Sequence, residues 1–199
     1  MLILQRMVGQ ASSEERKQEV LFMREKLLQL IPEFNEVRDH VLSGAVIKTW
    51  ETALNESGMT PEDLVDMPFT LLINPCPVNF IQHTRAVTRL ALAAADIYEQ
   101  IHDIKLKRDL LAAGALLHDV GKIVEYRRDG NTFVKSDTGR FLRHPFTGVS
   151  LALKCGIPPE AAHMIAAHSR EGDIGQRTPE SWIIHYADFS NFEPLCAMK

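Results

Sequence analysis

Apolar residues recur at helical spacing in the first third of the chain, separated by polar positions. The segment SSEE at 12–15 is typical of a helix start, and the apolar spacing continues to about Leu30. A second helix is predicted over 33–56, ended by Gly58, and Thr60 followed by proline begins a short third helix.

Residues 68–77 interrupt this pattern. They read PFTLLINPCP, and three prolines in ten residues predict an extended connector. We therefore place the boundary here, between a helical N-terminal extension (1–70) and a main domain (71–199). Trp50 is expected to anchor the extension against the main domain or a partner subunit. The extra helices thus either pack on the main domain or form a homodimer.

The main domain returns to helical spacing after residue 78. One face of a helix predicted over 78–99 collects His83, Val87, Leu90 and Ala94. Further helices are predicted over 107–118, 146–154, 158–168 and 179–192. Between them, Asp129-Gly130 is a strong hairpin-turn signal flanked by apolar positions from Val124 to Val134. The sequence predicts an all-α fold with a small β-hairpin insertion.

Composition and charge narrow the function classes. The 199 residues are 45% hydrophobic and 24% charged, which is ordinary for a globular domain with a real core. A net charge of -4 argues against extended nucleic acid as a partner. The three cysteines include no C-x-x-C pair and favour the reducing cytoplasm. No apolar run approaches the length of a membrane span, so no membrane partner is expected.

Four histidines lie at predicted helix ends or beside a turn signal, and two aspartates join them in an ordered set. The set is His83, His118, Asp119, His144, His168 and Asp188. One helix or hairpin separates successive histidine-bearing segments, and in an antiparallel bundle such elements project side chains into one cavity. Imidazole and carboxylate ligands together suit Fe, Mn, Co, Ni or Zn. The sequence predicts a site for one or two divalent transition metal ions.

A bridging Asp119 would join two metals and explain why an imidazole and a carboxylate follow an apolar helix. His83, His118 and Asp188 would complete one site, and His144 and His168 the other. Such a pair activates water and clamps the attacking and leaving oxygens of a displacement. The other histidines are expected to be core or surface residues, with His185 near enough to Asp188 to support a ligand. These are His40, His102, His163 and His185.

Five motifs carry a family resemblance. They are LLHDVGK around His118, FIQHTRAV around His83, RHPFTGVSLA around His144, AAHSREG around His168 and IIHYADF around Asp188. Their order resembles the HD-domain superfamily of metal-dependent phosphohydrolases over roughly residues 78–192. The resemblance implies a helical domain with one or two metals, the second held by the extra ligands of the two-metal subgroup. It also implies that Lys122 faces the substrate anion.

Several relatives within this superfamily remain as alternatives. The hairpin with HPFTGVSLA and ESWIIHYAD is most similar to a bacterial 3′→5′ exoribonuclease, although the N-terminal region reads helical where that enzyme has an oligonucleotide-binding barrel. HD-GYP phosphodiesterases have a His-His pair where this chain has His168-Ser169, and their GYP element is missing here. HD-type diiron oxygenases share the ligand order, which cannot separate them from hydrolases. A binding module without turnover is disfavoured by the intact ligand set.

We expect hydrolysis of a phosphate mono- or diester, in a nucleotide or a related small molecule, through a metal-activated water. Asp119 and Lys122 are the predicted catalytic residues, and Asp119 or Asp188 accepts a proton from the water. Lys122, Arg143 and Arg170 are predicted to bind the substrate phosphate. A solvated loop charge is the alternative for both arginines.

Overall fold

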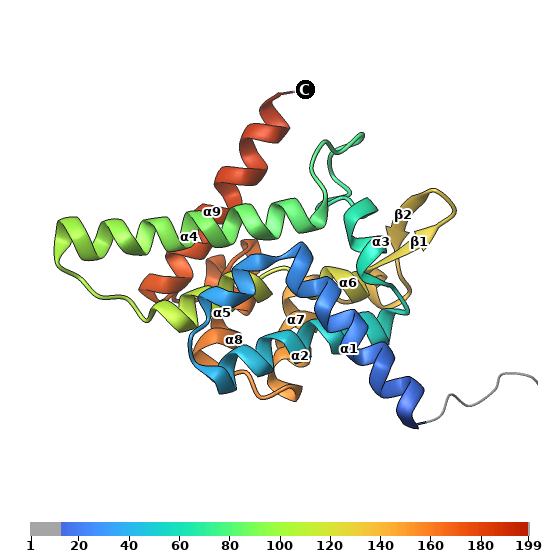
Figure 1. The fold of residues 1–199 in the computed structure, drawn as a ribbon. Helices are drawn as coiled ribbons and strands as arrows, with labels where there is room; N and C mark the ends of the chain where they lie inside the picture. Colours follow the sequence, from blue (N-terminus) through green and yellow to red (C-terminus); the bar gives the residue numbers. More distant parts are fainter. Residues whose placement is uncertain (1–12, 199) are drawn as a thin grey trace, which may run out of the picture.

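The computed structural model describes residues 13–198 and shows a helical bundle with one small hairpin (Figure 1). The α-helices are α1 Ser13–Leu30, α2 His40–Ser57, α3 Pro61–Asp66, α4 Phe80–His102, α5 Arg108–Leu117, α6 Lys122–Glu125, α7 His144–Lys154, α8 Pro159–Ala167 and α9 Pro179–Ala197. Short 3₁₀ turns are η1 Pro32–Glu36, η2 Thr138–Arg140 and η3 Arg170–Ile174. Strands β1 Tyr126–Asp129 and β2 Thr132–Lys135 pair antiparallel. The predicted all-α fold with a hairpin is confirmed.

The centre of the bundle is α5, which packs against α4, α8 and α9. In Figure 1 the long helix α4 runs along one side of the molecule, and α9 crosses it with its C-terminal end projecting beyond. The approach is close at Gly114, where a Cβ atom would lie 2.5 Å from Met164 Sδ and 2.9 Å from Ile184 Cδ1. A glycine therefore lets three helices meet, one turn before α5 delivers His118.

The N-terminal helices share a hydrophobic core with the rest of the chain. Leu27, Trp50, Phe80 and Leu116 belong to one buried cluster. Trp50 is fully buried, and its indole N–H donates a hydrogen bond to the Leu116 carbonyl at 3.1 Å. Trp50 therefore anchors the N-terminal helices against the main domain, which is one of the two expected roles. The domain boundary at residue 70 and the homodimer stay predictions.

The helix predicted over 33–56 is wrong at its start. The chain first forms the 3₁₀ turn η1, and α2 begins only at His40. The Asp39 carboxylate caps α2 by accepting two backbone N–H groups of its first turn, each at 2.9 Å. The backbone N–H of Asp39 itself donates to Asp109 at 2.8 Å. A local cap and a distant carboxylate together set this boundary.

Other boundaries also differ from the predictions, and Ser12 lies outside the described residues. Val124 lies in α6 rather than in the hairpin, α7 begins at His144, two residues early, and α9 continues five residues beyond Phe192 to Ala197. Leu90 is 46% exposed. Successive helical residues are about 100° apart, and the buried side of α4 is centred near Ala91, which leaves Leu90 just outside it.

No helix within residues 13–198 has both the length and the apolar character needed to cross a membrane.

Candidate metal centre

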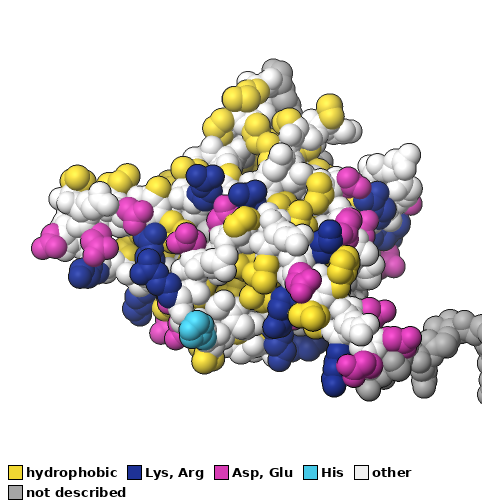
Figure 2. All heavy atoms as spheres, in the orientation of Figure 1, with side chains coloured by type: hydrophobic (Ala, Val, Ile, Leu, Met, Phe, Trp, Pro, Cys, Tyr) yellow, Lys and Arg dark blue, Asp and Glu magenta, His cyan; other side chains and the backbone are white. Residues whose placement is uncertain are grey.

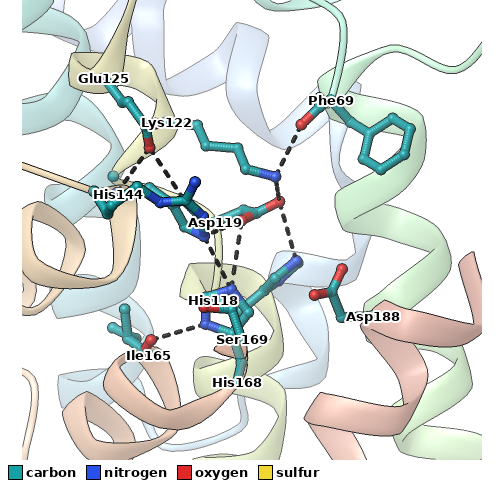
Figure 3. A network of polar contacts seen from close by, with 12 residues as sticks. Phe69, His118, Asp119, Lys122, Glu125, His144, Ile165, His168, Ser169 and Asp188 are labelled. Atoms are coloured by element: carbon teal, nitrogen blue, oxygen red, sulfur yellow. Dashed lines mark hydrogen bonds and ion pairs between the residues drawn. The ribbon is translucent and has the colours of Figure 1, made fainter. Parts of the chain in front are cut away.

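The structure brings all six predicted ligands together from different elements (Figure 3). His83 lies on α4, His118 and Asp119 directly follow α5, His144 begins α7, His168 directly follows α8, and Asp188 lies on α9. The Asp188 side chain is 14% exposed, and the other five ligands are buried. Two groups share Asp119: one with His83, His118 and Asp188, the other with His144 and His168.

Asp119 faces each group with a different oxygen. Its Oδ2 lies 3.3 Å from His83 Nε2 and 3.4 Å from His118 Nε2. Its Oδ1 lies 3.2 Å from His144 Nε2 and 3.6 Å from His168 Nε2. This is the geometry expected of a carboxylate that bridges two metals.

Hydrogen bonds on the far side of three imidazoles orient the lone pairs. His118 Nδ1 and His168 Nδ1 donate to backbone carbonyls one turn earlier, at 2.7 and 2.8 Å. His144 Nδ1 donates to Glu125 Oε2 at 3.1 Å. Because these oxygens can only accept, Nδ1 carries the proton and Nε2 presents a lone pair. All three lone pairs belong to atoms that face Asp119.

The resulting contacts favour a cation between the donor atoms. His144 Nε2 and His168 Nε2 lie 3.2 Å apart, with Asp119 Oδ1 against both, and this buried oxygen accepts no hydrogen bond. Three acceptors facing one another repel unless positive charge lies between them. Ligands about 2.0–2.2 Å from a divalent transition metal are separated by about 3–3.5 Å. The donor atoms therefore fit such an ion.

Electrostatics keeps the two carboxylates and the His144 imidazole in their metal-binding forms. Burial alone would raise the pKa of Asp119, but the charge of Lys122 and the contact with His118 outweigh it and hold that pKa well below its usual range. Burial would also raise the pKa of Asp188, but the contact with His83 at 3.1 Å outweighs it and lowers that pKa. Burial lowers the pKa of His144 to about 4. Ionised carboxylates and a neutral imidazole are the forms that bind metal.

Lys122 is a buried ammonium at the edge of the first group. It donates to Asp119 Oδ2 at 2.6 Å and to the Phe69 carbonyl at 2.8 Å. Burial alone would lower the pKa of Lys122, but the Asp119 charge raises it above its usual value. The lysine is therefore a fixed positive charge beside the centre.

The glycine of the LLHDVGK motif has a packing role. A Cβ atom on Gly121 would lie 2.1 Å from the His144 carbonyl oxygen and 2.7 Å from the Gly148 backbone nitrogen. Only glycine lets the chain after Asp119 pass this close to the first turn of α7, which carries His144. The motif thus joins the two ligand groups through a backbone contact.

A cavity of about 420 Å³ opens onto the centre. The predicted substrate-binding residues Lys122, Arg143 and Arg170 all line it, together with Asp119 and Asp188. Arg143 Nε lies 3.1 Å from Glu171 Oε1, another lining residue. The structure therefore places the predicted anion-binding side chains beside the predicted metal ligands.

Three supporting residues complete the centre, and only His185 was expected. His185 Nδ1 donates to the His168 carbonyl at 2.6 Å. Arg177 donates to the carbonyls of Ala167 and Ser169 at 2.7 and 2.9 Å, on either side of His168. Glu125, 2% exposed, also accepts the His144 backbone N–H at 2.7 Å. An acid in the apolar run after the HD pair was the signal that could have indicated Glu125.

Glu125→Ala is expected to weaken metal binding at the Asp119–His144–His168 group by about 10–100-fold, because His144 loses the carboxylate that orients its ring. Calorimetric titration of the metal-free protein with a divalent metal would separate binding at this group from binding at the group that contains His83. Glu125→Gln, whose amide oxygen can still accept from Nδ1, should recover most of the affinity. Equal weakening of both classes by Glu125→Ala would contradict a role specific to His144.

The fold and the two ligand groups define a helical protein with a candidate centre for divalent metal. The family model of the HD domain matches residues 80–189, more than half of the chain, and the chain belongs to the HD-domain family. The protein is a metal-dependent phosphohydrolase, as the sequence predicted.

Curated relatives share this domain to different extents. The chain is 31% identical over 176 residues to a dihydroneopterin 2′,3′-cyclic phosphate phosphodiesterase of Methanocaldococcus jannaschii, covering 82% of this chain and 67% of the relative. It is 38% identical to ribonuclease Y of Desulforudis audaxviator over 55% of this chain and 18% of the relative. It is 30% identical to the 3′-5′ exoribonuclease YhaM of Listeria welshimeri over 53% of this chain and 36% of the relative. No solved structure gives a significant match.

Proposed function

We propose that the protein opens a small cyclic phosphodiester to a phosphate monoester at this centre. The observation that carries the proposal is the set of acceptors converging on the two oxygens of Asp119, beside a cavity of small-molecule size. The relative that matches over most of its own length is named for a 2′,3′-cyclic phosphate, which supports a cyclic diester.

The reaction adds water across one P–O bond of the ring. Water oxygen bonds to phosphorus, the ring P–O bond breaks, and the departing oxygen gains a proton. Divalent metals bound at the two groups would activate the water and neutralise charge on the phosphoryl group. Asp188, whose carboxylate lines the cavity, is placed to take up the proton of the water. Lys122 contributes a fixed positive charge, and Arg143 and Arg170 hold the remaining phosphate oxygens.

The exoribonuclease-like alternative has weaker support. The chain covers only 18% and 36% of the two ribonucleases, so their substrates do not carry over directly. On the face in Figure 2, acidic and basic side chains are interspersed rather than gathered into a basic track. We therefore favour a small substrate over extended nucleic acid. The diiron oxygenase alternative has less support still, because the relatives above are named phosphodiesterase or ribonuclease.

We further propose a cytoplasmic location, supported by three free cysteines in the described chain. The metal is proposed to be Fe, Mn, Co, Ni or Zn, because the mixed imidazole and carboxylate donors accept all five.

The proposed activity is tested with protein stripped of metal and reloaded with each of the five ions. We expect release of a phosphate monoester from nucleoside 2′,3′-cyclic phosphates, followed by phosphorus NMR. A 5′-labelled oligoribonucleotide and an oxygen electrode run beside it. Shortening of the oligonucleotide without ring opening, or stoichiometric oxygen uptake, would overturn the proposal in favour of one of the two alternatives.

A further inference from the structure

We propose that the cavity holds a planar ring of the substrate against an aromatic wall. The wall consists of Phe192 and Phe189, with Leu72 at its edge and Phe69 behind it. The substrate would then be a cyclic phosphodiester that carries a planar heterocycle, such as a nucleoside or another fused-ring compound. This inference rests on the proposed function, whose site it shares.

The wall begins at the metal ligands themselves. Phe192 lies four residues after Asp188, so the two share one face of α9 about one turn apart. The Phe69 ring stacks on the His83 imidazole at 4.3 Å between centroids, and its edge meets Phe192 at 6.3 Å. Aromatic surface therefore continues from the first ligand group into the cavity.

The wall is held in place by hydrogen bonds to the segment after α3. The Phe69 carbonyl accepts from Lys122 Nζ at 2.8 Å. The backbone N–H of Phe69 donates to the Val78 carbonyl at 3.3 Å, and that of Leu72 donates to Thr70 Oγ1 at 3.2 Å. These contacts fix the short segment from which Leu72 lines the cavity.

The apolar groups on this wall are only partly covered. Phe69 is 1% exposed, whereas Leu72 is 71% exposed and the side chains of Phe189 and Phe192 are half-buried. All four line the cavity. Covering apolar surface releases about 25 cal/mol per Å², and aromatic side chains favour stacked or edge-on rings. A flat ring would cover what the protein leaves open here.

Charged side chains next to the second ligand group in the chain also line the cavity, which gives the substrate a direction. Arg143 precedes His144, and Arg170 and Glu171 follow His168. These three residues line the cavity together with His144. In Figure 3, Phe69 and Asp188 lie on one side of Asp119, and His144 and Glu125 lie on the other. When the substrate phosphate lies between the two ligand groups, the aromatic wall is available to the uncharged part of the substrate.

The test compares one ring-bearing and one ring-free substrate, guanosine 2′,3′-cyclic phosphate and glycerol 1,2-cyclic phosphate. Phe192→Ala is expected to lower kcat/KM for the guanosine compound, relative to kcat/KM for the glycerol compound, about tenfold. The loss should come mainly from a higher KM, and its size is that expected when one base-stacking side chain is removed. Phe192→Leu, which keeps apolar bulk without a ring, should recover only part of the ratio. Phe141→Ala, at a phenylalanine that is 87% exposed and does not line the cavity, should leave it at the wild-type value.

The outcomes separate this inference from the function on which it rests. If the wild type opens both substrates and Phe192→Ala leaves their ratio unchanged, the ring-binding wall is wrong and the function stands. Full recovery of the ratio by Phe192→Leu would show that apolar bulk at this position is sufficient and that the phenylalanine ring is not needed. If the wild type opens neither substrate, both proposals fail. Calorimetric binding of guanosine alone to wild type, weakened in Phe192→Ala, is an expected result that does not depend on turnover.

Discussion

Asp119→Asn is expected to lower kcat by at least about 10³-fold and to release metal from both ligand groups. The carboxylate faces His83 and His118 with one oxygen and His144 and His168 with the other. An amide leaves one oxygen donor and places an N–H against imidazole lone pairs in the other group. Removal of a single charge-stabilising group already costs about 10²–10³ in kcat, and this change affects both metals.

Elemental analysis of metal per chain, beside kcat on the same preparations, checks this expectation. His144→Ala should remove metal from one group only, whereas Asp119→Asn should empty both. Asp137→Asn is the matched control, because the Asp137 side chain is 94% exposed and pairs with Arg140, away from the centre. Full retention of both metals by Asp119→Asn would contradict the bridging role and leave Asp119 as a ligand of neither.

Lys122→Met is expected to lower kcat about 10²–10³-fold while metal content stays at the wild-type level. The ammonium is not placed among the metal ligands, but it donates to Asp119 and Phe69 and borders the cavity. Its third N–H can meet phosphate charge that develops during ring opening. Lys122→Arg should not restore kcat, because a planar guanidinium cannot reproduce a compact buried ammonium.

Steady-state kinetics with metal analysis separates the roles of Lys122. A rise in KM at unchanged kcat would make Lys122 a ground-state binding residue. Loss of metal together with kcat would make it a support for Asp119 instead. Lys154→Met, which removes an exposed lysine paired with Glu56, is the control for the change of charge.

Most of the fold could be predicted because helical spacing is a local property. The helices that carry the site, the hairpin around Asp129-Gly130 and the connector before α4 follow the pattern of apolar, glycine and proline positions. Element boundaries were less accurate where distant groups decide them. The start of α2 depends on the contact of Asp39 with Asp109, seventy positions away in the chain.

The ligand set could be predicted because histidine and aspartate at helix ends differ from their apolar surroundings. Of the supporting residues only His185 was predicted, from its spacing to Asp188. Arg177 reads as an ordinary loop charge, yet it binds the carbonyls on either side of His168. Phe192 reads as one more apolar helix position, yet it lies half-buried beside the ligands.

The sequence by itself indicated the helical fold, the six candidate ligands with their order, and hydrolysis as the expected chemistry. These depend on periodicity and residue type, which neighbouring positions reveal. The tertiary structure alone decided how the two Asp119 oxygens are divided, that Glu125 contacts His144, and that aromatic and charged side chains line one cavity. Each of these depends on groups tens of residues apart, whose distances are set by the packing of α4, α5, α7, α8 and α9 against one another.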